Sequence, residues 1–280
     1  MLNRPSAVTR LHFKLQPTGA DISLEPEVLI VAGYTGRDHG EVLAHIRELA
    51  EHGIEPPEAV PCFYPLSPSL LVQGEHLVTA SEETSGEAEV ALLVAGDEVY
   101  VTVASDHTDR AAERIDVALS KATCQKVLAE EAWRLSDVLD HWDSLRLRSW
   151  IGEERDDLYQ DGSTEALLSP TDILGAIPWK SRAQSFVVLC GTVPAIGGLR
   201  GGSVFRAELS DRQTDASLAL RYRIDVRSFL ASPEEKHQAT ESAGAERIGA
   251  AARSFGVEMS EDRVAQLGAR LEALEQRLLG

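Results

Sequence analysis

The sequence predicts an α+β protein, because apolar, β-branched runs typical of strands occur alongside segments with helical spacing. Two such runs flank the turn dipeptide Gly96-Asp97, and Ser185 to Cys190 has the continuous apolar character of a buried strand. Further strands are expected at 8–15, 29–34, 204–209 and 218–226. Helical spacing is clearest after Asp38 and after Ser260. We therefore expect a β-rich core with peripheral helices.

The composition is that of an ordinary globular protein, with 43% apolar and 26% charged residues among 280. A chain of this length can bury a sizeable core, as one large domain or as a main domain with an appendage. The formal charge of −18 argues against nucleic acid or an anionic membrane as a partner, since both bind clustered Lys and Arg. Solubility is the simplest explanation of this charge.

Two further observations concern the compartment. No apolar run approaches the roughly 20 residues of a membrane span, and the first residues lack the apolar core of a signal peptide. Cys62, Cys124 and Cys190 are widely spaced, so they suit neither a disulfide framework nor a zinc site. We therefore expect a cytoplasmic protein whose cysteines are small buried apolar residues.

Composition changes divide the chain into three predicted parts. Residues 1–58 are expected to pack on the core as an N-terminal segment. Pro56-Pro57 and Pro61 exclude a helix through the loop that follows. Residues 59–230 form the predicted β-rich core. Residues 231–280 form a predicted helical extension, rich in Ala, Glu, Gln and Arg. Its apolar stripe must pack on the main domain or on a second copy of the chain.

The segment that begins at Asp38 is predicted to be a helix with Asp38 as its N-cap. His45 and Glu48 are three residues apart and can share one face, as a histidine base oriented by a carboxylate requires. A surface ion pair would have the same spacing. A second, less favoured pair is His39 with Glu41.

The stretch from 85 to 110 is organised around a predicted β-hairpin with a two-residue loop at Gly96-Asp97. This loop places Glu89 opposite Ala104. The residues that directly face each other share one side of the sheet, as do residues two apart along a strand. A change of one residue in the loop would move every side chain to the other face.

Three carboxylates converge in this register, because Glu87 lies opposite Asp106 and two residues from Glu89. Their Cβ atoms should lie roughly 5 to 7 Å apart. Carboxylates that close repel each other unless a cation lies between them. The pattern predicts a site for Mg²⁺, or for Mn²⁺ or Ca²⁺, which oxygen ligands suit. The alternative is the solvated edge of an ordinary hairpin.

Two segments downstream add chemistry to this hairpin. Lys121 lies between stretches predicted to be helical at 111–117 and 128–135, and it could complement a substrate carboxylate or a developing oxyanion. An ordinary surface lysine is the alternative. The strand that ends at Cys190 continues into the Gly-rich turn from Gly191 to Gly198, whose N–H groups could bind an anion.

These segments occur in the order found in the fumarylacetoacetate hydrolase superfamily, which the chain resembles over roughly residues 60–210. The superfamily carries a Glu-x-Glu strand, an Asn-Asp-x-Ser-x-Arg-Asp motif, a Lys-Ser-Phe-Asp segment, a Gln-x-x-x-Thr turn and a Gly-Thr-Pro-x-Gly-x-Gly loop. The corresponding segments here are Glu87-Ala-Glu89, Asp106-His-Thr-Asp-Arg110, Ser120-Lys121, Gln160-Asp-Gly-Ser-Thr164 and Gly191-Thr192-Val-Pro-Ala-Ile-Gly197.

The chain departs from the superfamily pattern at several of these motifs. Ser105 replaces the usual Asn, Ala111 replaces the Asp after the Arg, and Ser85 stands where many relatives have His. The Phe-Asp that follows the Lys is missing, and the connection from Glu89 to Asp106 is shorter than usual. We expect the three metal ligands to be kept and the surroundings of the substrate to differ.

The resemblance implies a mixed β-roll or barrel-like core, with Glu87, Glu89 and Asp106 holding Mg²⁺, or Mn²⁺ or Ca²⁺. It also implies that Lys121 donates to the substrate and that a His-Glu pair, His45 with Glu48, activates water. The remaining implied substrate-site residues are Arg110, Gln160, Thr164, Gly191 and Thr192.

The implied function is hydrolysis of a C–C bond in an acylpyruvate-like 2-oxo acid through a metal-stabilised enolate, by a homodimer. One alternative is a lyase or dehydratase, decarboxylase or isomerase that acts on a 2-keto-3-deoxy sugar acid or a related 2-oxo acid. The other alternative is a protein that binds a ligand without catalysis.

Overall fold

The structure, a computed structural model, describes residues 9–51, 56–57, 59–153, 157–178 and 183–227. The chain divides into two compact units, residues 1–227 and 228–280. The second unit, with the predicted helical extension 231–280, lies outside the described residues. The domain boundaries proposed at 58 and 230 stay predictions, and all of the described helices and strands belong to the first unit.

Ten strands of the described chain form one large mixed sheet. Its main path runs in the order β2 (Ala20–Leu24), β1 (Leu11–Leu15), β12 (Glu131–Arg134), β9 (Glu98–Ser105), β8 (Ala88–Ala95), β15 (Ser185–Thr192), β3 (Val28–Gly33) and β4 (Cys62–Leu66). Off this path, β11 (Lys126–Leu128) pairs with β9 and with β5 (Leu71–Gln73). Within this path, the neighbouring strands β8 and β15 are almost wholly buried.

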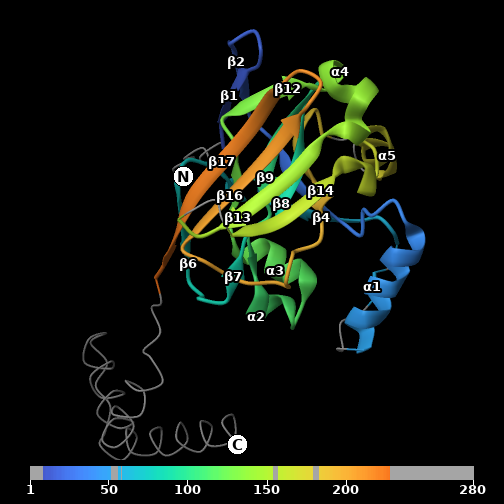
Figure 1. The fold of residues 1–280 in the computed structure, drawn as a ribbon, viewed down its shortest axis with the longest axis vertical. Helices are drawn as coiled ribbons and strands as arrows, with labels where there is room; N and C mark the ends of the chain where they lie inside the picture. The colour runs from blue at the N-terminus through green and yellow to red at the C-terminus, as the bar shows by residue number, and fades with distance from the viewer. Residues whose placement is uncertain (1–8, 52–55, 58, 154–156, 179–182, 228–280) are drawn as a thin grey trace, which may run out of the picture. The chain divides into compact units, whose positions relative to one another are not determined.

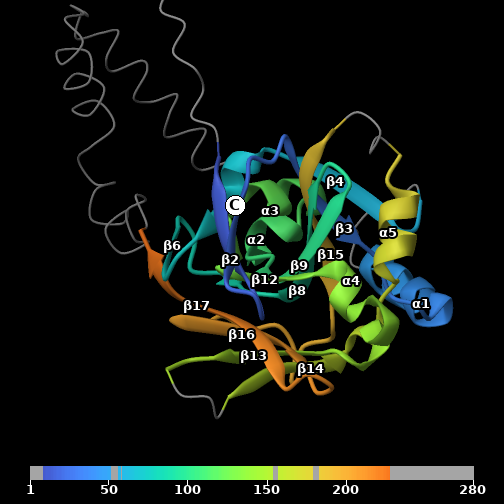
Figure 2. The same cartoon turned by 90° about the horizontal axis from the view of Figure 1, so that it is seen from above.

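A second sheet has five strands, in the order β14 (Leu158–Ser163), β13 (Arg146–Ile151), β16 (Val204–Asp211), β17 (Ala216–Val226) and β6 (His76–Thr79). A two-strand ladder joins β7 (Thr84–Ser85) to β10 (Thr108–Asp109). Figure 2 shows β13, β14, β16 and β17 as a separate layer against the large sheet, which curves around on its other side. This α+β architecture confirms the predicted fold class.

The described helices are short apart from α1. They are α1 (His39–Glu51), α2 (Arg110–Glu113), α3 (Val117–Thr123), α4 (Leu135–Val138) and α5 (Pro170–Ala176), with 3₁₀ turns η1 (Pro68–Leu70), η2 (Leu139–Ser144) and η3 (Thr164–Ala166). Figure 1 shows α2 and α3 beyond one end of β8 and β9, and Figure 2 shows them within the outline of the curved sheet. Among these helices, none combines the length and apolar character that a membrane crossing requires.

Apolar side chains fill both sides of the large sheet. Along β8, Val90 and Leu92 pack in the core between the two sheets, where they meet residues such as Leu147 and Phe205. Ala91 and Leu93 point the other way, into a second core inside the curve of the large sheet. The alternation along β8 therefore decides which side chains face the inside of the curve.

The β8–β9 hairpin has the predicted register. Glu89 pairs with Ala104 and Ala95 pairs with Glu98, so the loop is the dipeptide Gly96-Asp97. Gly96 has φ +59°, a conformation that glycine adopts without the Cβ strain of other residues. The local turn signal was therefore sufficient to predict the pairing.

Two other local predictions had opposite outcomes. Asp38 is the cap of α1, since its Oδ1 accepts from the N–H groups of Gly40 and Glu41. The helix predicted at 128–135 is wrong, because β11 ends at Leu128 and β12 (Glu131–Arg134) pairs with both β1 and β9. Pairing inside a large sheet overrides a weak helical preference.

Candidate functional site

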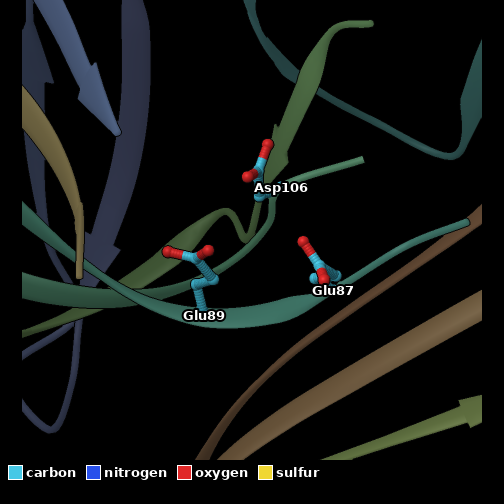
Figure 3. Close-up of side chains that lie close together, drawn as sticks. All are labelled: Glu87, Glu89 and Asp106. Atoms are coloured by element: carbon cyan, nitrogen blue, oxygen red, sulfur yellow. The ribbon is translucent and has the colours of Figure 1, made fainter. Parts of the chain in front are cut away.

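The three predicted carboxylates lie together at the open end of the β8–β9 hairpin. Glu87 precedes β8, Glu89 lies on β8, and Asp106 follows β9, with the Asp106 N–H donating to the Glu87 carbonyl at 2.9 Å. One ligand oxygen from each lies within 4.8 Å of the others. Figure 3 shows the three side chains rising from the same side of the two strands. We refer to these three residues as the carboxylate cluster.

Two lysines bind Asp106, which is fully buried. Lys121 Nζ lies 2.5 Å from Oδ2, and Lys126 Nζ lies 2.7 Å from Oδ1. Burial alone would raise the pKa of Asp106, but these two positive charges outweigh burial and lower it. Burial alone would lower the pKa of Lys121, but the neighbouring carboxylates outweigh burial and raise it. Asp106 and Lys121 are therefore held in their charged forms.

Glu89 is also buried, with 3% of its surface exposed, but its pKa shifts in the direction opposite to that of Asp106. Burial, together with the charges of Asp106 and Glu87, raises its pKa well above the ordinary value for a glutamate. Lys121 and the Gly191 N–H, which donates to Oε2 at 2.7 Å, oppose this rise but do not cancel it. Burial and the neighbouring carboxylates therefore both disfavour the charged form of Glu89, which a bound cation would favour.

Arg110 holds the edge of the carboxylate cluster. Its Nη2 lies 3.1 Å from Glu87 Oε1, its Nε donates to Ser85 Oγ at 2.7 Å, and its Nη1 pairs with Glu113 at 2.7 Å. It begins helix α2, whose first N–H groups are capped by Asp109. A pocket of about 380 Å³ opens here, with Ser85, Arg110 and Glu113 in its lining. Small ligands therefore have room beside Arg110, which contacts Glu87 through Nη2, although Glu87 itself does not line this pocket.

Gln160 and Thr192 lie behind the cluster and bind the backbone of β8. Gln160 Oε1 accepts from the Ala88 N–H at 2.9 Å, and its Nε2 donates to Thr192 Oγ1 at 2.6 Å. The Thr192 hydroxyl donates to the Ala88 carbonyl at 2.7 Å. Ala88 lies between Glu87 and Glu89, and its N–H and carbonyl groups are thus bound by two side chains that do not belong to the hairpin. These contacts orient the two glutamates.

The other predicted site residues lie elsewhere. Thr164, on η3, is buried, and its hydroxyl donates to the carbonyls of Trp142 and Leu145; none of its described hydrogen bonds reaches the carboxylate cluster. His45 and Glu48 lie on α1, and their side chains are outside the described part of the chain. Their role as an acid–base pair stays a prediction.

Sequence reasoning missed Lys126, which is fully buried on β11 and also donates to the His107 carbonyl at 2.7 Å. A signal for it was present: Lys126 directly precedes the apolar residues Val127, Leu128 and Ala129, and a charged residue that opens a buried strand needs a partner.

His107 and Tyr222 form a second buried polar group on the other side of Asp106. His107 Nδ1 lies 2.9 Å from the Tyr222 hydroxyl, which also contacts Ser105 Oγ at 2.8 Å. Burial, followed by the charges of Lys126 and Arg110, lowers the pKa of His107 to about 3. His107 is therefore neutral at physiological pH, and its described side-chain hydrogen bond goes to Tyr222 instead of to the carboxylate cluster.

The donor set suits a hard divalent cation. Three carboxylates, two of them buried, can supply oxygen ligands within 4.8 Å of one another from one side of the sheet. Mg²⁺, Mn²⁺ and Ca²⁺ all bind such oxygen ligands. The residues present therefore fit a metal site, in which Arg110, Lys121 and Lys126 would surround the ligands.

Solved structures of known proteins share this fold. A fumarylpyruvate hydrolase from Pseudomonas aeruginosa, solved with Mn²⁺ and pyruvate, has a TM-score of 0.56 and 16% identity, covering 81% of this chain and 100% of its own. A 2-keto-3-deoxyarabinonate dehydratase has a TM-score of 0.52 and 18% identity, covering 72% and 74%. The resemblance to the fumarylacetoacetate hydrolase superfamily is thereby confirmed for the fold.

The sequence comparisons place the chain more narrowly. No curated protein matches it. A family described as a protein of unknown function, DUF2848, matches residues 32–222, which include the whole carboxylate cluster and its lysines. The protein is therefore a member of the DUF2848 family, built on the fumarylacetoacetate hydrolase fold.

Proposed function

We propose that this protein is a metal-dependent enzyme that hydrolyses a C–C bond in an acylpyruvate-like 2-oxo acid. The observation that carries the proposal is the buried convergence of Glu87, Glu89 and Asp106 within 4.8 Å on this fold. The similar fumarylpyruvate hydrolase, which was solved with Mn²⁺ and pyruvate, supports both the ion and the ligand class.

The carboxylate cluster would hold Mg²⁺, Mn²⁺ or Ca²⁺, and such an ion, when bound, supplies Lewis-acid stabilisation of negative charge on a keto oxygen. Arg110 braces Glu87 from the side of the pocket. Lys121 is placed to donate to an anionic group that enters the cluster, because its Nζ already lies among the carboxylates. His45, oriented by Glu48, would accept a proton from the attacking water.

The residues of the Gly-Thr loop and the Gln-Thr turn have a different proposed role. The Gly191 N–H and the Thr192 hydroxyl already bind Glu89 and Ala88, and Gln160 is fully engaged with protein groups. We infer that these residues, with Thr164, position the site and do not bind substrate directly. Carboxylates that are already held in place lower the entropy cost of ordering the site when substrate binds.

A lyase, dehydratase, decarboxylase or isomerase of a 2-keto-3-deoxy sugar acid is the second candidate. The similarity to 2-keto-3-deoxyarabinonate dehydratase favours it, and the same stabilisation of charge on a keto oxygen serves these reactions. The third candidate is a non-catalytic protein that binds such ligands. Binding of metal and oxalate without turnover of any 2-oxo acid would favour this candidate.

The experiment has two stages. Calorimetry with Mg²⁺, Mn²⁺ and Ca²⁺, alone and with pyruvate or oxalate, tests the site, and a panel of 3-acylpyruvic and 2-keto-3-deoxy acids tests turnover. Glu89→Gln should weaken metal binding by about 100-fold or more, since even outer residues of metal sites are worth about 10–100-fold. Glu98→Gln, an exposed carboxylate at the other end of the same hairpin, is the control. A wild-type protein that binds neither metal nor oxalate would refute the enzyme proposal.

The assembly and location follow the same proposal. We infer a homodimer in the cytoplasm with a small-molecule substrate and no nucleic-acid or membrane partner. The net charge of −18 and the apolar stripe of Val264, Leu267, Leu271, Leu274 and Leu278 support this inference. Sedimentation of the full chain tests it, and a monomer at micromolar concentration would contradict it.

A further inference from the structure

Lys121 contacts two members of the carboxylate cluster, Glu87 and Asp106. One oxygen of each of these two carboxylates lies next to another cation, with Arg110 Nη2 3.1 Å from Glu87 Oε1 and Lys126 Nζ 2.7 Å from Asp106 Oδ1. Their other oxygens face Lys121 Nζ, at 3.5 Å from Glu87 Oε2 and 2.5 Å from Asp106 Oδ2. A divalent ion held by the carboxylate cluster would need carboxylate oxygens that the Lys121 ammonium already contacts. The ammonium and the ion therefore compete for one place.

The charges around this place strengthen the competition. Arg110, Lys121 and Lys126 already bring three positive charges to Glu87, Asp106 and Glu113. A divalent ion alone would add two more positive charges to this largely buried site, where unbalanced charge is costly. An anionic chelator would offset the added charge.

Lys121 can also leave its position more readily than Lys126 can. It lies near the end of α3, and its side chain is 11% exposed, whereas the Lys126 side chain is fully buried and is also bound to the His107 carbonyl. A lysine side chain has four rotatable carbons between its backbone and its charge, so its ammonium can move without a change in the fold. Lys126 would stay on Asp106 in either arrangement.

We propose that Lys121 is the resident cation of the carboxylate cluster, and that a divalent ion binds weakly alone but tightly together with an anionic 2-oxo acid. This inference rests on the proposed metal-dependent function and adds a regulation of the same site. On metal binding, the Lys121 ammonium would leave the oxygens of Glu87 and Asp106 and would then be free to bind the anionic ligand. Lys121 thus couples the binding of metal to that of substrate.

The test is equilibrium binding of Mn²⁺ to the full-length protein, with and without saturating oxalate, corrected for Mn²⁺–oxalate binding in solution. For the wild type, we expect oxalate to increase the Mn²⁺ affinity about tenfold or more, within the usual range of coupling between two sites. Lys121→Met should bind Mn²⁺ about tenfold more tightly without oxalate, and oxalate should then add much less. Lys14→Met, an exposed lysine on β1, is the matched control and should behave like wild type.

The outcomes separate this inference from the proposed function. If Lys121→Met binds Mn²⁺ no more tightly than a wild type that does bind it, the inference is wrong and the proposed function stands. If neither protein binds Mn²⁺ with or without oxalate, the proposed function fails and the inference fails with it. Should Lys121→Met not fold, thermal unfolding of wild type decides: Mn²⁺ alone should raise Tm little and Mn²⁺ with oxalate clearly more, and equal shifts would overturn the inference.

Discussion

The two ends of the β8–β9 hairpin differ in burial and in the contacts that hold them, although they belong to the same pair of strands. At the turn end, Gly96 makes the loop and an exposed ion pair joins Glu98 to Arg134 at 2.5 Å. At the open end, Asp106 is fully buried and is bound by lysines from α3 and β11. The turn end depends on its own sequence, whereas the open end depends on residues from several other segments.

The difference has an electrostatic origin. An exposed ion pair in water contributes little to stability, because solvent screens it and both side chains lose freedom. A buried carboxylate without its cation is strongly unfavourable, because neither water nor another charge compensates it. The same kind of contact is therefore expected to have very different consequences at the two ends.

The largest expected effect is that of Lys126→Met, which leaves one side of buried Asp106 uncompensated. We expect a loss of about 3–5 kcal/mol in the free energy of unfolding, measured by urea denaturation. Arg134→Met, which removes the exposed pair at the turn end, should cost about 1 kcal/mol or less. Equal losses in the two variants would break the comparison between the two ends.

Two glycines, Gly191 beside the carboxylate cluster and Gly96 in the hairpin turn, allow the backbone at the two ends to be compared. Both have positive φ, +95° at Gly191 and +59° at Gly96, so alanine is strained in either place by about 1–2 kcal/mol. A Cβ at Gly191 would in addition collide with the Thr35 side chain, whereas a Cβ at Gly96 meets nothing. Gly191→Ala should therefore lower the free energy of unfolding by about 1–3 kcal/mol more than Gly96→Ala does.

Both glycine variants can be compared by urea denaturation, and calorimetry supplies a second measurement for the site. Gly191→Ala should also weaken Mn²⁺ binding, because its N–H would no longer be placed to donate to Glu89. Gly96→Ala is the control, and its metal affinity should equal that of wild type. Equal losses of stability in the two variants, with unchanged Mn²⁺ binding in Gly191→Ala, would disprove the expected difference.

A smaller effect on stability is expected from substitution of Asp211, a buried carboxylate of β16 whose described partners do not include a lysine. Burial would raise its pKa, but hydrogen bonds from Thr214, His141 and the Gln213 N–H outweigh burial and lower it. A carboxylate with a lowered folded-state pKa stabilises the fold above its unfolded pKa of about 3.9 and loses this contribution as the pH falls through the folded value.

Asp211→Asn should therefore cost about 1–2 kcal/mol at pH 7, less than Lys126→Met. The difference from wild type should shrink as the pH falls below about 4, because Asp211 then becomes protonated in the unfolded chain while it is still charged in the fold. Urea denaturation at pH 7, 5 and about 3.5 gives the measurement. A difference that grew toward low pH would contradict the assigned pKa direction.

Local sequence signals predicted much of the framework. The Gly96-Asp97 turn determined the hairpin register, and that register placed Glu87, Glu89 and Asp106 on one face, as the structure has them. Asp38 likewise marked the start of α1. Where the signal was weak, as at 128–135, the prediction of a helix was wrong, because the pairing of β12 between β1 and β9 is not encoded locally.

What the sequence determined by itself, then, was the carboxylate cluster: alternation along paired strands decides which side chains share a face, whatever surrounds them. What the tertiary structure alone decided was the charge around it. Lys121, Lys126 and the Gly191 N–H reach the cluster from different elements, over long separations in the chain. Electrostatic energy depends on distance and burial in space, and no spacing along the sequence contains either.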